Sequence, residues 1–261
     1  MNTRIKFLKK PKLRKPVIFT GLPGIGLVGK IAIEYLVSQL KCVKIAEIYS
    51  DSFPPSIVTK KGLAELIYDE IYWFKGKGRD FLFLAGPVQP PLDFRIAGSA
   101  EHYEFSRTLV EAFKKMKITK IITVAGIDIG EDRISKEPKI VVIGTDKKIL
   151  NEFKKDSVLL GSEGLVTGAA GLLIGMGAEQ GIEGVCLMGQ TSSRLVLADH
   201  QSAQKVVELL AKKFNFKVNV KEIEAEAKKV EKAFSSLQEQ LHAQREEKEK
   251  PGEEEFKKYT R

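Results

Sequence analysis

A glycine-rich stretch near the start of the sequence constrains the fold more than any other part of the chain. Residues 17–20, Val-Ile-Phe-Thr, are mostly β-branched or aromatic and predict a short strand. Four glycines and a proline follow in residues 21–29, and apolar residues recur with helical spacing up to Leu36. A strand, a glycine turn and a helix open an α/β unit, in which glycine lets the backbone turn sharply and approach another group closely.

Two nucleotide-binding motifs overlap in this turn. Gly24, Gly26 and Gly29 have the spacing of the dinucleotide fingerprint Gly-x-Gly-x-x-Gly. The same glycines, followed by Lys30, also have the spacing of a phosphate-binding loop, although Ile31 replaces the Ser or Thr that would hold magnesium. Two other interpretations stay open. The glycines permit a tight turn with close packing of the helix on the sheet, or the loop contacts a protein partner.

A second glycine-rich block lies in the last third of the chain, where residues 161–189 contain nine glycines. Residues 168–177 combine small side chains with leucine and isoleucine, which predicts a buried helix packed closely on a sheet. The loop at residues 161–168 leaves an alternative, a ligand held at the start of that helix, where unpaired N–H groups collect.

Both blocks resemble one known family. Residues 21–29, Gly-Leu-Pro-Gly-Ile-Gly-Leu-Val-Gly, resemble the opening of the PAC2 family, which contains the proteasome assembly chaperones and their archaeal homologues. Residues 161–173 and 186–191 resemble a second part of that family, and so does Gly-Pro-Val-Gln-Pro at residues 86–90. The resemblance covers roughly residues 15–215. It implies an α/β fold with a phosphorylase/hydrolase-like three-layer core and no catalytic set.

The remaining core elements are predicted from hydrophobic patterns. Residues 43–49 read as a strand that closes a βαβ unit, and the helix at 101–117 begins next to His102, which is expected at the surface. Further strands are predicted at residues 81–85, 118–125, 139–143 and 185–188, and helices at residues 146–153 and 201–214. The period-two pattern of residues 63–74 and the turn signal Gly-Lys-Gly at residues 76–78 predict a hairpin.

Composition narrows the class of protein. The chain has 261 residues, of which 43% are hydrophobic, enough for a substantial core. The formal net charge is +9, and the cations of residues 1–15 predict a solvated edge strand rather than a nucleic-acid site. Cys42 and Cys186 form no disulfide or metal-ligand pattern. We expect a cytoplasmic protein with no signal peptide and no membrane span, and the abundant Lys and Glu are compatible with a thermophilic source.

The C-terminal part changes in character after residue 217. Apolar residues then recur at alternating spacings of four and three, as in the seam of a coiled coil. We therefore divide the chain into an α/β domain at 1–217, a protruding heptad helix at 218–250 and a flexible tail at 251–261. The predicted oligomerisation contacts in the seam are Ile223, Val230, Phe234, Leu237 and Leu241.

The tail ends in two aromatic residues, and we predict that Phe256, Tyr259, Thr260 and Arg261 bind a partner. Proteasome activators and some assembly chaperones are similar in ending with a hydrophobic residue, a tyrosine and any last residue. This chain departs from that pattern because Tyr259 is third from the end and Lys258 precedes it. A tail that stays disordered is the alternative.

No residue pattern indicates catalysis, a cofactor or a metal site. The resemblance implies a non-enzymatic proteasome assembly chaperone homologue that forms homo-oligomers and binds proteasome α-subunits or a related partner. The alternative is a nucleotide- or phosphate-binding enzyme, described as ATP-grasp-like, that uses the glycine loop at residues 21–30. A scaffold for another cytosolic protein is a third interpretation.

Overall fold

The computed structural model describes residues 2–91, 99–154, 156, 158–193, 198–225, 228 and 232. Its strands are β1 (Thr3–Phe7), β2 (Val17–Gly21), β3 (Val43–Ser50), β4 (Ile57–Lys60), β5 (Leu63–Leu66), β6 (Asp69–Lys75), β7 (Asp80–Ala85), β8 (Lys120–Asp128), β9 (Ile140–Gly144), β10 (Leu159–Leu160) and β11 (Glu183–Thr191). Its helices are η1 (Ile25–Leu27), α1 (Val28–Gln39), α2 (Ser99–Lys115), α3 (Asp132–Ser135), α4 (Lys147–Phe153), α5 (Gly168–Glu179), α6 (His200–Phe214) and η2 (Val220–Glu222).

Nine strands of the described chain form one mixed sheet in the order β1-β3-β6-β7-β2-β8-β11-β9-β10. Strands β7, β2, β8 and β11 are parallel neighbours at its centre. Strand β3 also runs parallel to β2, but β6 and β7 lie between them. The βαβ unit predicted from residues 17–49 is therefore present, with its two strands apart in the sheet. Strands β4 and β5 form a separate hairpin.

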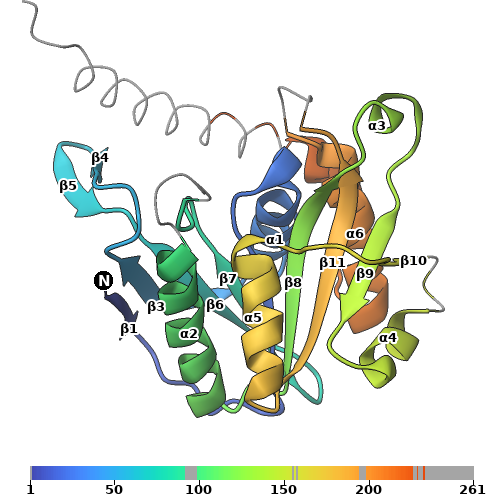
Figure 1. Cartoon of the computed structure of the whole chain (residues 1–261). Helices are drawn as coiled ribbons and strands as arrows, with labels where there is room; N and C mark the ends of the chain where they lie inside the picture. Colours follow the sequence, from blue (N-terminus) through green and yellow to red (C-terminus); the bar gives the residue numbers. More distant parts are fainter. Residues whose placement is uncertain are drawn as a thin grey trace, which may run out of the picture.

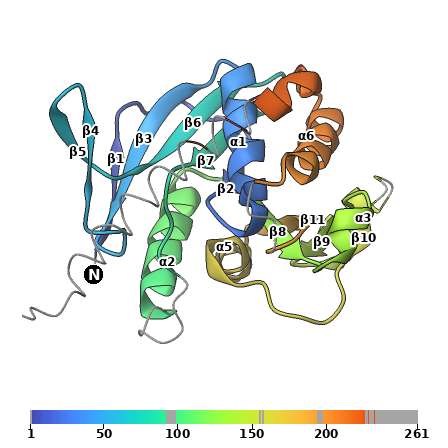
Figure 2. The same ribbon diagram turned by 90° about the horizontal axis from the view of Figure 1, so that it is seen from above.

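Helices cover both faces of the sheet, which gives the predicted three layers (Figures 1 and 2). Helices α1 and α6 pack on one face, and α2 and α5 on the other. The buried hydrophobic residues form two core clusters, the first under α1 and α6 and the second under α2 and α5. Successive side chains of β2 point to opposite faces of the sheet, so Val17 and Phe19 belong to the first core cluster and Ile18 to the second. The fold is thus the α/β arrangement expected from the sequence.

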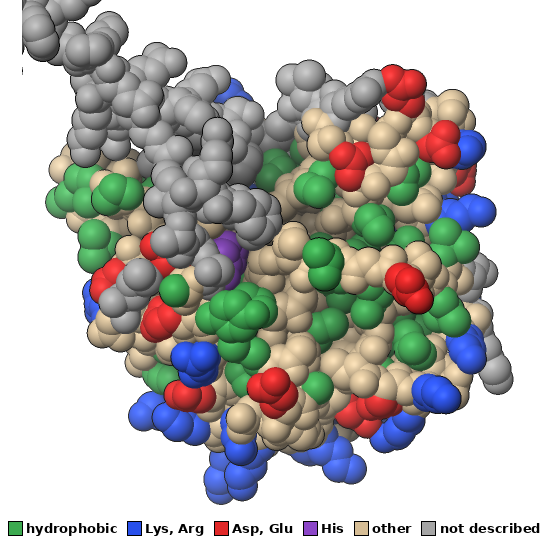
Figure 3. Space-filling view, in the orientation of Figure 1, with side chains coloured by type: hydrophobic (Ala, Val, Ile, Leu, Met, Phe, Trp, Pro, Cys, Tyr) green, Lys and Arg blue, Asp and Glu red, His purple; other side chains and the backbone are tan. Residues whose placement is uncertain are grey.

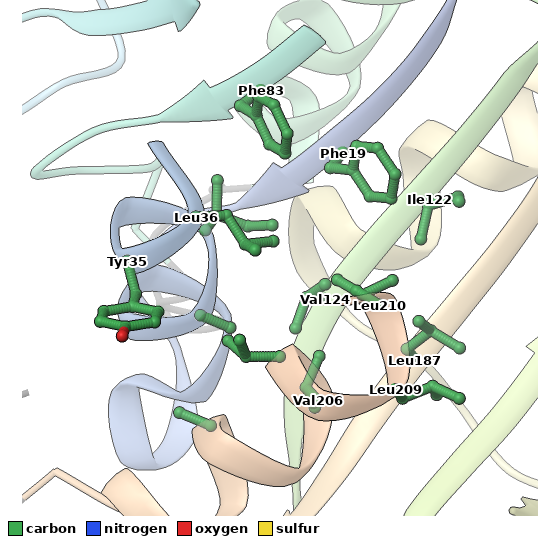
Figure 4. Packing of buried hydrophobic residues seen from close by; sticks show 14 of the residues in the cluster. Phe19, Tyr35, Leu36, Phe83, Ile122, Val124, Leu187, Val206, Leu209 and Leu210 are labelled. Carbon is green, nitrogen blue, oxygen red and sulfur yellow. The ribbon is translucent and has the colours of Figure 1, made fainter. Parts of the chain in front are cut away.

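Aromatic packing holds β2 firmly under α1 and α6. The ring of Phe19 stacks on that of Phe83 with centroids 5.2 Å apart, and Phe214 meets it edge-on at 5.0 Å. Figure 4 shows Leu36 from α1 and Leu210 from α6 in the same cluster. This packing fixes the end of β2, from which the first glycine turn departs.

The first core cluster extends past residue 217. Phe216 and Ile223 are buried in it, and Val220 packs against it. The hydroxyl of Tyr35 donates a hydrogen bond to the carbonyl oxygen of Asn219. Residues 216–223 therefore pack on the α/β domain.

The basic N-terminal residues form the edge strand that the sequence predicts. Strand β1 pairs with β3 in antiparallel register and ends the sheet on that side. Lys6 pairs with Glu47 at 3.2 Å, and the Arg4 guanidinium lies 4.4 Å from the centroid of the Tyr49 ring. Among the described helices, none is long and apolar enough to span a membrane.

Candidate functional site at the carboxyl end of the sheet

The first glycine turn brings helix α1 into contact with the strands beneath it. A Cβ atom added at Gly29 would lie 2.2 Å from the carbonyl oxygen of Val124 on β8, and one at Gly21 would lie 2.1 Å from the Gly29 carbonyl oxygen. Gly26 has φ +62°, a backbone conformation that favours glycine. At these positions the close-packing interpretation of the glycines is confirmed.

Lys30 is engaged by neighbouring groups of the protein. It is buried, its ammonium donates a hydrogen bond to the carbonyl oxygen of Gly86 at 3.1 Å, and it forms an ion pair with Glu34 one helical turn later. Lys30 thus ties α1 to the loop that follows β7. The ammonium is engaged by the protein itself, unlike the lysine of a phosphate-binding loop, which reaches into that loop.

A buried carboxyl group lies beside Lys30. Asp69 is fully buried, and a Cβ atom at Gly86 would overlap its carboxyl group. Burial raises the pKa of Asp69 well above its usual range, while the backbone N–H of Val88 and the charge of Lys30 act in the opposite direction. This arrangement packs the loop after β7 tightly against β6.

The loop after β7 closes over the glycine turn. Gln89 donates a hydrogen bond from its side-chain amide to the carbonyl oxygen of Pro23. His102 at the start of α2 is 4% exposed, so its predicted surface position is wrong. Burial lowers the pKa of His102, while the nearby backbone of Pro91 and Pro90 and the charge of Glu101 act in the opposite direction. The backbone of Pro90 and Pro91 lies near this buried histidine, which local sequence does not reveal.

The second glycine block also ends at this part of the sheet. Helix α5 covers β8 and β11, as the sequence predicts. Its N-cap residue, Thr167, makes no side-chain capping hydrogen bond. Because the helix begins over the carboxyl ends of the parallel strands, its first N–H groups face the region of the glycine turn (Figure 1).

A small cavity of about 110 Å³ lies between the two glycine blocks. Thr20 faces it from β2 with only 3% of its surface exposed, and Ala169 and Ala170 face it from the first turn of α5. The other lining residues are Leu22, Pro23, Gly24, Ile25, Gly29, Gln89, Val124, Ala125, Gly126 and Thr167. The candidate site therefore combines backbone of both glycine blocks with one buried hydroxyl group.

A buried ion pair that sequence reasoning missed supports the other side of the glycine turn. Arg133 contacts both carboxylate oxygens of Asp199 at 2.8 Å. Asp199 also caps helix α6 by accepting from the N–H of Ser202, and its own N–H donates to the carbonyl oxygen of Gly26 at 2.9 Å. Arg133 and Asp199 are 66 positions apart, so no local pattern indicates that they pair.

Charged side chains are distributed unevenly around this region. No cluster of three or more His, Cys, Asp or Glu side chains within the described ranges could hold a metal ion. Cys42 and Cys186 are free thiols. In Figure 3 many Lys and Arg side chains lie along the lower edge of the molecule, and others lie along its right-hand edge up to the upper end. The described residues that line the candidate site carry no charged side chain.

The predicted oligomerisation and partner-binding residues lie mostly outside the described part of the chain. Ile223 is described, and it is 1% exposed within the core of its own domain. Val230, Phe234, Leu237 and Leu241 of the seam and Phe256, Tyr259, Thr260 and Arg261 of the tail lie outside the described residues. Both sets of contacts remain predictions.

Comparison with known proteins shows that the chain is similar in sequence and structure to archaeal proteins. An uncharacterized protein of Methanocaldococcus jannaschii is 28% identical over 227 residues, covering 86% of this chain and 84% of its own length. The crystal structure of Pyrococcus furiosus PbaB, an archaeal proteasome activator, is similar with a TM-score of 0.77 and 29% identity, covering 90% of this chain and 98% of that chain. Pyrococcus furiosus PbaA, an archaeal homolog of proteasome-assembly chaperone, shares the fold with a TM-score of 0.74 and 24% identity, covering 94% and 100% of the two chains.

The model of the PAC2 family matches residues 18–238, which include both glycine blocks and the candidate site. This range contains nearly all of the described sheet and its helices. The resemblance noted in the sequence is therefore confirmed, and the chain belongs to the PAC2 family.

Proposed function

We propose that this protein is a non-enzymatic homologue of the proteasome assembly chaperones, which forms homo-oligomers and binds proteasome α-subunits or a related protein. The observation that carries the proposal is the similarity to PbaB, an archaeal proteasome activator, along 90% of this chain and 98% of that one. Because the similarity extends over nearly the whole of both chains, it concerns the complete domain and not one shared motif.

The proposed self-association uses the heptad seam. Ile223 is already buried in its own domain, so the part of the seam available to another subunit begins at Val230. A helix with one narrow apolar stripe gains stability by packing that stripe against a partner. The tail beyond Gly252 is the proposed partner-binding segment, with Phe256 and Tyr259 as its anchors.

The first test is the native mass of the pure full chain, alone and mixed with proteasome α-subunits from the same organism. We expect a defined homo-oligomer alone and a larger complex after mixing. Truncation after Ala225 should lower the mass of the oligomer, since it removes the seam and keeps Ile223. Truncation after Gly252 should preserve the homo-oligomer and weaken only the complex with α-subunits.

Point variants separate the seam from general effects of charge. Phe234→Glu with Leu237→Glu places charges in the seam and should dissociate the oligomer. Ser235→Glu with Ser236→Glu adds the same charge at neighbouring positions outside the predicted seam and should not. A monomeric full chain would refute the proposed self-association. A homo-oligomer that does not bind α-subunits would mean that the partner is a different protein.

The alternative function is a nucleotide- or phosphate-binding enzyme that uses Gly24, Gly26, Gly29 and Lys30. Two observations count against it: the close packing of Gly29 on Val124 and the engagement of Lys30 by Gly86 and Glu34. The cavity beside the loop, at about 110 Å³, is also smaller than the ~300–1,000 Å³ of typical small-molecule sites. A thermal-shift experiment with ATP and NAD tests this alternative, because a ligand of the native state must raise the melting temperature.

A further inference from the structure

We propose that the small cavity between the two glycine blocks is a binding site for a small oxyanion of the size of inorganic phosphate. The cavity is defined by Thr20, by the first turn of α5 and by the glycine turn after β2. The proposal concerns ligand binding alone and involves no reaction. It does not depend on which protein the chain binds or on its oligomeric state.

The cavity lies where an open α/β sheet most often binds ligands. Strands β2 and β7 are parallel neighbours, but the helices that follow them, α1 and α2, cover opposite faces of the sheet. At such a switch point the two connections diverge and leave a crevice at the carboxyl ends of the strands. The loops after β2 and β7 meet over this crevice through the hydrogen bond from Gln89 to Pro23.

The other side of the crevice opens between β2 and β8. Their ladder ends at the pair Thr20 and Thr123, while β8 continues to Asp128. The continuing residues Val124–Gly126 line the cavity opposite the glycine turn. The space therefore arises from the course of the strands, and it does not depend on the position of a single mobile side chain.

Thr20 is a largely buried residue that lines the cavity and has no hydrogen-bond partner for its hydroxyl group among the described residues. Val17 and Phe19 face α1 and α6, so Thr20, like Ile18, points toward the face covered by α5. The residue is 3% exposed and lines the cavity, and no described residue forms a hydrogen bond with its hydroxyl group. A ligand in the cavity could therefore form a hydrogen bond with this hydroxyl group without displacing a protein partner.

The N-terminus of α5 supplies further donors. Ala169 and Ala170 line the cavity, and across the described chain no residue accepts a hydrogen bond from their backbone N–H groups. These N–H groups belong to the first turn of a helix of 12 residues, whose dipole places partial positive charge at this end. An oxyanion satisfies both the N–H donors and the dipole.

The lining also limits the charge and size of the ligand. Among the described residues the lining has no carboxylate, so these residues offer a metal cation no anionic ligand. The described lining residues include no lysine, and the ammonium of Lys30 is engaged by Gly86 and Glu34. A cavity of about 110 Å³ holds several waters and is too small for a whole nucleotide. A small tetrahedral oxyanion matches these properties.

The test is calorimetric titration of the full chain with inorganic phosphate, in a chloride-containing buffer of constant ionic strength. We expect saturable binding of one phosphate per chain. Thr20→Val keeps the shape of the side chain and removes the hydroxyl group, so phosphate affinity should fall at least about tenfold. Thr20→Ser restores a hydroxyl group and should restore most of that affinity.

Thr123→Val is the matched control. Thr123 is fully buried, is the register partner of Thr20 on β8, and does not line the cavity. It receives the same change in side chain and should leave phosphate affinity within about twofold of the parent value. Thermal unfolding of all three variants without phosphate checks that each one is folded.

Parallel titrations with ATP distinguish free phosphate from the phosphate group of a larger molecule. The proposal is overturned if phosphate does not saturate, if Thr20→Val binds it as tightly as the parent chain, or if ATP binds and phosphate does not. Thr20→Val should not change the native mass of the chain with or without α-subunits. Failure of phosphate binding is therefore distinguishable from failure of the proposed protein interaction.

Discussion

Gly29 is the residue at which helix α1 and strand β8 approach most closely. Gly29→Ala would place a methyl group 2.2 Å from the carbonyl oxygen of Val124, which is backbone and cannot rotate away. Alanine gains about 0.5–1 kcal/mol in a helix interior, but this overpacking costs about 1–3 kcal/mol or more. We therefore expect Gly29→Ala to lower the free energy of unfolding in a urea titration.

Gly24→Ala is the control for this prediction. A Cβ atom at Gly24 meets nothing within 4 Å, and its φ of −164° is open to any residue. The free energy of unfolding should change by less than about 0.5 kcal/mol. Equal stability of the two alanine variants would contradict the close-packing explanation of the first glycine block.

Asp69 should make stability depend on pH. Because burial raises its pKa in the folded state, the folded protein binds the proton more tightly than the unfolded chain. The contribution of Asp69 to stability is therefore complete below the unfolded pKa of about 4, and it is lost as pH rises through the folded pKa. Asp69→Asn removes this titration and keeps a similar shape.

Urea titrations at pH 5 and pH 8 test this effect. We expect the stability of Asp69→Asn relative to the parent chain to be greater at pH 8 than at pH 5. Comparison at each pH cancels the titration of the remaining groups, provided that they are unchanged by the substitution. A difference between the two proteins that is constant with pH would show that Asp69 has the same pKa in both states.

Single residues were predictable where their role is local. The spacing of Gly24, Gly26 and Gly29 indicates a tight turn, because backbone conformation depends on neighbours in the sequence. His102 is buried near the backbone of two prolines that precede it, and the exposed position predicted for it was wrong. The hydroxyl group of Thr20, which has no partner among the described residues, lies where two strands diverge, which no motif in the sequence expresses.

Elements follow the hydrophobic pattern closely. The continuous apolar run at residues 81–85 is the buried central strand β7, and the small residues at 168–177 lie within α5, as predicted. The pattern does not determine which strands pair. Strand β3 is separated from β2 because the β6–β7 hairpin, which follows it in sequence, lies between them. Long-range pairing depends on the whole sheet, so strand order could not be predicted.

Asp199, at the start of helix α6, should stabilise the fold by more than its capping hydrogen bond alone. Asp199 caps α6 and also forms the buried pair with Arg133, whereas Asp146 caps α4 at an exposed position by accepting from the N–H of Ile149. Asp199→Ala leaves the Arg133 charge buried and should cost about 3–5 kcal/mol. Asp146→Ala removes one cap and should cost about 1 kcal/mol. Chemical denaturation of both variants measures the difference, and equal losses would show that the Arg133 pair adds nothing.

At the scale of the molecule, the described chain forms one α/β domain. Its hydrophobic core includes residues beyond 217, where the change in composition had placed the end of the domain. The shift to polar residues after 217 marks where the heptad pattern begins, but Val220 and Ile223 still pack on the first core cluster. Composition is an average over many residues, so it cannot tell whether one apolar residue packs in the domain core or begins the heptad seam. Ile223 fits both patterns in the sequence, and packing places it in its own domain.

The position of Ile223 predicts how truncated chains behave. A chain ending at residue 217 loses Ile223, the packing of Val220 and the hydrogen bond from Tyr35 to Asn219. It should unfold about 2–5 kcal/mol more easily than a chain ending at residue 225, as expected when a buried aliphatic side chain is removed. Urea titrations at two protein concentrations measure this difference and reveal any contribution from self-association.

In the longer chain, Ile223→Ala should reproduce much of the loss in stability, while Lys221→Ala, at an exposed position, should not. If the shorter chain were equally stable, residues 218–225 would belong to the protruding helix alone, and Ile223 would again be available to join the proposed seam.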